Sequence, residues 1–124
     1  MMGELTETIL ADAAAWRDWL SRHHESSTEV WLVIGRKGTI RPTSLSQAQA
    51  LEEALCQGWI DSQARRRDDS TYLQRFTPRR AKSPWSRRNV GIVERLQRGG
   101  RMCPAGLAEV ERAKADGRIQ HQRH

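Results

Sequence analysis

The stretch that decides the fold is GWIDSQARRRDDSTYLQRFTP, at residues 58–78. Residues typical of β-strands flank its polar centre, RRDDS at 66–70, where Asp and Ser favour a turn. The flanking strand formers are Trp59, Ile60, Tyr72, Leu73 and Phe76. The pattern therefore predicts a β-hairpin.

Alternation along the two strands of this hairpin predicts which side chains share a face. A period of two places Asp61, Gln63 and Arg65 together on the first strand. The same period places Arg75 and Thr77 together on the second strand. Polar side chains aligned in this way predict a wet face or a polar groove.

Helical patterns surround the hairpin, with one further strand. Apolar residues at helical spacing predict helices at 12–24, 44–58, 84–98 and 104–117. A β-branched and aromatic run, EVWLVIGRKG at 29–38, predicts a buried strand. We therefore expect an α+β domain in which a small antiparallel sheet, a strand plus the hairpin, packs with about four helices.

Three of the helix starts carry capping signals. Asp12 is placed to cap the first helix, and Ser44 with Gln47 has the spacing of a capping box. Ser83 precedes Pro84, a residue suited to the first position of a helix. These signals set the predicted helix boundaries.

Length and composition bound the class of protein. The 124 residues fit a single domain, 1–124, with a polar tail from about residue 118. No apolar run is long enough to span a bilayer, and the acidic start MMGELTETILADAAAW is unlike a signal peptide, so we expect no membrane insertion and a cytoplasmic location. Cys56 and Cys103 stand far apart without a CxxC motif, which predicts reduced thiols and neither a metal site nor a disulfide framework, and we expect no cofactor.

Positive charge is concentrated in one segment of the chain. Residues 61–101 hold twelve Lys or Arg against four Asp or Glu, a balance of +8 in a chain whose formal charge is +6. Clustered cations steer anions toward a surface, so the segment favours an anionic partner. A solvated arginine surface without a ligand remains the alternative.

Five blocks of sequence carry a family resemblance. They are EVWL at 29–32, ALEEALCQGWIDS at 50–62, RFTPRR at 75–80, SPWSRRN at 83–89 and GRMCPAGLAEVERAKADGR at 100–118. In this order they resemble the YdeI/OmpD-associated family, also called the bacteriocin-protection or OmdA-like family. The resemblance implies a role in stress response or antimicrobial resistance, and it brings no established catalytic residues.

The predicted binding site is a basic, Trp-lined groove for an anionic or planar small molecule. Arg75 and Arg79 would contact the anion, and a helix start near Ser83 would add its positive end. The full set is Lys37, Trp59, Asp61, Arg75, Thr77, Arg79, Arg80, Ser83, Trp85, Ser86 and Asn89, with both tryptophans as walls and Asp61 and Asn89 as orienting groups. The same residues could instead cap the helix and tie it to the hairpin.

Three other possibilities stay open. Basic residues interleaved with aromatics suit nucleic acid, bound by the hairpin and the following helix. An enzyme could use Asp61 and Glu53, whereas Cys56 has no His near it in sequence to activate it. An exposed tryptophan in so small a domain would favour a homodimer.

Overall fold

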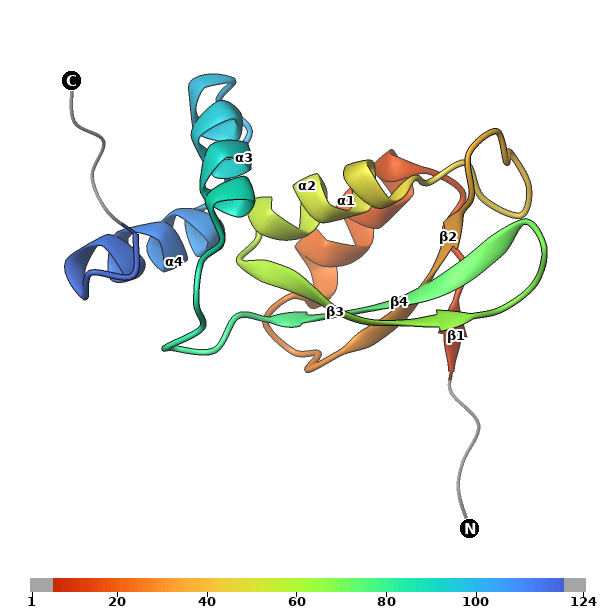
Figure 1. The fold of residues 1–124 in the computed structure, drawn as a ribbon, viewed down its shortest axis with the longest axis horizontal. Helices are drawn as coiled ribbons and strands as arrows, with labels where there is room; N and C mark the ends of the chain where they lie inside the picture. The colour runs from red at the N-terminus through yellow and green to blue at the C-terminus, as the bar shows by residue number, and fades with distance from the viewer. Residues whose placement is uncertain (1–5, 120–124) are drawn as a thin grey trace, which may run out of the picture.

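The computed structural model describes residues 6–119, and it confirms the α+β class. Within these residues, four helices pack with a four-stranded sheet (Figure 1). The elements are β1 Glu7–Thr8, α1 Ala13–His23, β2 Val30–Gly35, α2 Gln47–Cys56, β3 Trp59–Arg66, β4 Thr71–Pro78, α3 Arg87–Arg98 and α4 Pro104–Ala115.

The sheet has the strand order β1-β2-β4-β3. Strands β3 and β4 form the predicted hairpin, and β4 also pairs antiparallel with β2. Strand β1 adds a parallel edge to β2, so the sheet is mixed rather than antiparallel throughout. A strand of two residues is too short to leave an alternating pattern in the sequence, which is why it was not predicted.

A bulge in β3 corrects the predicted faces of the hairpin. The register of β3 against β4 shifts between Asp61 and Ala64, so that Asp61 lies opposite Phe76 and Arg65 lies opposite Leu73. Phe76 and Leu73 are three residues apart and face opposite sides of the sheet. The expectation that Asp61 and Arg65 share a face was therefore wrong, because an extra residue in a strand reverses the alternation beyond it.

Two apolar cores meet at α2. Helices α1 and α2 cover one face of the sheet (Figure 1), where Trp16, Trp59 and Phe76 are almost wholly buried. The other side of α2 packs against α3 and α4 through a second cluster that includes Leu55, Val93 and Val110. Residues on α2 between these cores are thereby held from two sides.

The first helix start is confirmed, and two others lie later than predicted. Asp12 accepts a hydrogen bond from the Ala15 N–H at 2.9 Å. The capping box is formed by Ser46 and Gln49, not by Ser44 and Gln47. Ser44 is unsuited to the role because its backbone N–H is bound at 2.9 Å to the carbonyl of Ala11, which lies just before α1.

Helix α3 begins three residues beyond the expected Pro84. Ser86 is its N-cap and accepts from the Asn89 N–H at 3.0 Å. Ser83 closes a turn instead, since its hydroxyl accepts from the Arg80 N–H at 3.0 Å. A serine near a helix start can serve a turn as readily as a cap, which is what Ser83 does.

Three further observations bear on the remaining expectations. No helix within residues 6–119 combines the length and the apolar character that crossing a membrane requires. All five tryptophans are buried or half-buried, so none offers the exposed ring on which a homodimer was expected. Arg118 and Ile119, at the start of the predicted polar tail, pack against the body, and residues 120–124 lie outside the described residues.

Candidate functional site

The residues expected to line one groove occupy several separate places. Arg75 on β4 is paired with Glu29, with 2.6 Å between the guanidinium Nε and the carboxylate. Trp59 is only 1% exposed, inside the first core. Asp61 accepts from the Gln47 amide at 3.3 Å, beside the start of α2.

Six of the expected residues lie near one another, five in the connection between β4 and α3 and Asn89 in the first turn of α3, and Thr77 stands half-buried on β4 just before the connection. They are Arg79, Arg80, Ser83, Trp85, Ser86 and Asn89, of which Ser83 and Ser86 serve the turn and the cap described above. The Arg79 guanidinium lies 3.6 Å from the centre of the Trp85 ring and donates to the Pro84 carbonyl at 3.1 Å. Burial lowers the pKa of Arg79 to about 10. These contacts fix the connection in place.

Replacing Arg79 with alanine should destabilise the fold by about 2–3 kcal/mol, because the change removes the stacked side chain from a buried position. Arg79→Met keeps the volume and removes the desolvated charge, so we expect it to stay within about 1 kcal/mol of the parent. Urea denaturation measures both. If the alanine variant unfolds at the same urea midpoint as the parent, Arg79 does not stabilise the fold, and a role in ligand binding is favoured instead.

Lys37 lies in the exposed loop after β2, beside a shallow hollow of about 450 Å³. The hollow is lined by Gly35, Arg36, Lys37, Gly38, Thr39, Ser44, Ser46, Gln47 and Tyr72. The Arg36 guanidinium stands 5.3 Å from the centre of the Tyr72 ring. The hollow is basic and polar, but it holds no buried charged group.

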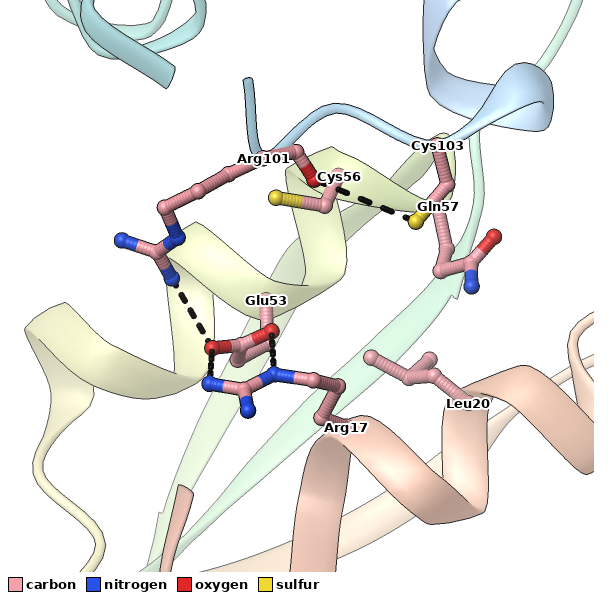
Figure 2. A pocket seen from close by; sticks show the side chains of 7 residues that line it. All are labelled: Arg17, Leu20, Glu53, Cys56, Gln57, Arg101 and Cys103. Atoms are coloured by element: carbon pink, nitrogen blue, oxygen red, sulfur yellow. Dashed lines mark hydrogen bonds and ion pairs between the residues drawn. The ribbon is translucent and has the colours of Figure 1, made fainter. Parts of the chain in front are cut away.

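A second cavity, of about 320 Å³, combines buried charge with thiols. It opens between α1, α2 and the segment that leads into α4 (Figure 2). Its lining residues are Arg17, Leu20, Glu53, Cys56, Gln57, Arg101 and Cys103. We take this cavity, named the α1–α2 cavity from here on, as the candidate site.

The centre of the α1–α2 cavity is the Glu53 carboxylate, whose side chain is only 5% exposed. Arg17 donates two hydrogen bonds to this carboxylate, from Nε to Oε1 at 3.0 Å and from Nη2 to Oε2 at 2.8 Å. Arg101 adds a third, from Nη2 to the same Oε2 at 2.9 Å (Figure 2). A buried carboxylate needs such partners, because desolvation of an unpaired charge is costly.

The surrounding charges leave the cavity with a positive balance. Arg101 also binds Glu52 at 3.0 Å, and Arg95 binds Glu52 at 3.2 Å from outside the cavity. Three guanidinium groups thus share two carboxylates. Hydrogen bonding to Glu53 raises the pKa of Arg17, which keeps that guanidinium charged.

The two cysteines stand on the wall of the α1–α2 cavity. Cys56 is buried at the end of α2, and Cys103 is half-buried just before α4. The Cys103 N–H donates to the Cys56 carbonyl at 3.0 Å, so the two backbones are in direct contact. Burial first, and then the charge of Glu53, raise the pKa of Cys56 to about 11.

The acid and base considered for an enzyme do not meet. Asp61 is bonded to Gln47, whereas Glu53 is held by Arg17 and Arg101. Among residues 6–119, no group of three His, Cys, Asp or Glu side chains is arranged to hold a metal ion. The Asp61 and Glu53 carboxylates are therefore engaged by different partners in this structure.

Sequence reasoning missed most of this cavity. Glu53 was considered only as an acid or base, and Arg17 and Arg101 were not singled out. The available signal was the pair Glu52 and Glu53 in the middle of an apolar helix, since a carboxylate on a buried face requires a cation. Which of the chain's many arginines supplies that cation depends on tertiary packing.

A family model described as a domain of unknown function, DUF8412, matches residues 8–109 of the chain. The match includes every residue that lines the α1–α2 cavity. No curated protein and no solved structure matches the chain.

Proposed function

We propose that this chain, which belongs to the DUF8412 family, a domain of unknown function, is a binding protein for a small organic anion. The ligand would occupy the α1–α2 cavity, with its acidic group against Arg17 and Arg101. A carboxylate or a phosphate monoester fits the donors that two guanidinium groups present.

One observation carries the proposal: two arginines share a single buried carboxylate oxygen. Oε2 of Glu53 accepts from both Arg17 and Arg101. Arg17 donates to the Glu53 carboxylate through Nε and Nη2, and its side chain remains 60% exposed. A guanidinium has five N–H donors in a fixed geometry, so donors remain beyond those that bind Glu53. The excess positive charge favours an anion as their acceptor.

The size and the walls of the cavity narrow the class of ligand. A volume of about 320 Å³ is at the lower end of the range of small-molecule sites, roughly 300–1,000 Å³. Leu20 and the two thiols offer an apolar wall, and the Gln57 amide can pair with one more polar group. These features support a compact acid with an apolar body.

This proposal keeps the ligand class expected from the charge of the chain and moves the site away from the hairpin. We further propose that the protein works in the cytoplasm and contributes to tolerance of antimicrobial compounds or stress, as the resemblance to the YdeI/OmpD-associated family implies. Sequestration of an acidic compound would be enough for such a role. A deletion strain with unchanged sensitivity across a panel of acidic antimicrobials would speak against it.

Binding itself can be tested by titrating isotope-labelled protein with benzoate, phenyl phosphate and inorganic phosphate. The expected result is a saturable shift of the Arg17 and Arg101 Nε–H signals in nuclear magnetic resonance spectra, strongest for the organic anions. Arg95→Gln is a matched control, because Arg95 joins the same ion-pair network without lining the cavity. Shifts confined to the Lys37 loop would place the anion site in the other hollow.

Nucleic acid is a second candidate ligand, favoured by the solvent face of α3. Helix α3 projects from the body of the protein in Figure 1, and its exposed residues include Arg87, Arg88, Gly91 and Arg98. A duplex DNA probe should then bind at low salt and weaken steeply as salt rises. Substituting alanine at all three arginines should flatten that dependence, and an unchanged salt slope would exclude this face.

A further inference from the structure

The two cysteines lie within reach of one another although 46 residues separate them in the sequence. Cys103 and Cys56 are joined by a backbone hydrogen bond of 3.0 Å between N and O, and hydrogen-bonded residues on paired strands have Cα atoms about 5.5 Å apart. Disulfides span Cα separations of about 4.4–6.8 Å. The backbone contact between Cys103 and Cys56 therefore suits a spacing that a disulfide accepts.

The close packing of the two segments holds this spacing fixed. A Cβ atom added to Gly106 would lie 2.3 Å from the Cys56 carbonyl oxygen, and one added to Gly58 would lie 3.1 Å from the Ala105 carbonyl oxygen. Only glycine permits such an approach between the end of α2 and the start of α4. Since folding has already brought the chain segments together, little entropy remains to be lost on cross-linking.

The two sulfurs have different neighbours in this structure, so a disulfide requires a change of rotamer. Figure 2 shows the Cys103 sulfur on the side of its segment that faces Cys56, whereas the Cys56 sulfur points toward Arg101. Turning Cys56 about its Cα–Cβ bond into another staggered rotamer would bring its sulfur toward Cys103.

We propose that Cys56 and Cys103 are a modification site for hydroperoxides, and that oxidation joins them in an intramolecular disulfide. Cys103 attacks first: an S–O bond forms as the peroxide O–O bond breaks, which gives a sulfenic acid on Cys103 and an alcohol or water. The Cys56 sulfur then attacks the sulfenic sulfur. The S–S bond forms, the S–O bond breaks, and the oxygen leaves as water with the thiol proton of Cys56.

Exposure sets the order of these two steps. Cys103 is half-buried at the cavity wall, so a small peroxide can reach it. Cys56 is only 3% exposed, so a peroxide from solution reaches Cys103 first. Cys56 therefore acts as the resolving thiol.

The test is stoichiometric hydrogen peroxide added to the folded protein, followed by peptide mapping without reduction. We expect one linked peptide pair that contains Cys56 and Cys103, with no cross-link between chains. Cys56→Ser should stop at a sulfenic acid on Cys103 that dimedone traps, and Cys103→Ser should leave Cys56 unmodified. Two free thiols in the treated parent protein, a disulfide between two chains, or fast oxidation of Cys103→Ser would overturn the proposal.

Oxidation would also regulate anion binding, a consequence that rests on the proposed function. Rotation of Cys56 withdraws its sulfur from the cavity wall beside Arg101 and reshapes the site. We expect the phenyl phosphate affinity of the treated protein to change several-fold and to recover on reduction. A disulfide that forms in a protein with no anion affinity in either state would refute the binding function alone, whereas anion binding without a disulfide would refute the thiol site alone.

Discussion

Replacing Gly106 with alanine should destabilise the protein by about 2–3 kcal/mol or more, because the added methyl group would clash with backbone atoms. The new Cβ would lie 2.3 Å from the Cys56 carbonyl oxygen and 2.7 Å from the Leu55 carbonyl oxygen. Both are backbone atoms of α2, so relief requires a shift of α4 as a whole. Equilibrium unfolding in urea would show the loss as a lower midpoint.

Gly91→Ala is the matched control for this substitution. Gly91 also lies inside a helix, α3, but a Cβ there meets no atom within 4 Å. Alanine at an open helical position should stabilise by roughly 0.5–1 kcal/mol. If Gly106→Ala also left the midpoint unchanged or raised it, the tight junction of α2 with α4 described above would be incorrect.

Anion affinity should change in opposite directions when the two sides of the central ion pair are altered. Arg17→Gln removes one of the two cationic contacts and should weaken phenyl phosphate binding roughly 10- to 100-fold, since a charge-assisted hydrogen bond contributes about 1.5–3 kcal/mol. Glu53→Gln removes the competing internal anion and should strengthen binding. Isothermal titration calorimetry measures both effects.

The opposite signs separate binding from general damage to the fold. Arg22→Gln is the control for Arg17→Gln: it lies on the same helix, pairs with Asp18 at 3.1 Å and does not line the cavity. It should leave the affinity unchanged. Equal weakening by Arg17→Gln and Glu53→Gln would mean that the Glu53 network only supports the structure.

Local patterns were enough to predict the main elements of the fold. The turn residues between two runs of β-formers predicted β3 and β4, and Asp12 predicted the start of α1, because each signal depends on a few neighbouring residues. The short strand β1 and the bulge after Asp61 left no such local pattern.

The candidate site could not be predicted in the same way. The α1–α2 cavity joins Arg17, Glu53 and Arg101, which come from three distant parts of the chain. Their meeting depends on how α2 packs between the two cores, and a single sequence does not carry this information. The basic and aromatic pattern at Arg79 and Trp85, which suggested a ligand site, forms a cation–π contact and a hydrogen bond to the Pro84 carbonyl within the chain.

The most direct test of the account is a crystal structure of the protein grown with phenyl phosphate. We predict the phosphate in the α1–α2 cavity, within hydrogen-bond distance of both Arg17 and Arg101, and the ring against Leu20 and the thiols. Phosphate bound only at the Lys37 loop or on the solvent face of α3, with the Glu53 network unchanged, would contradict the central claim.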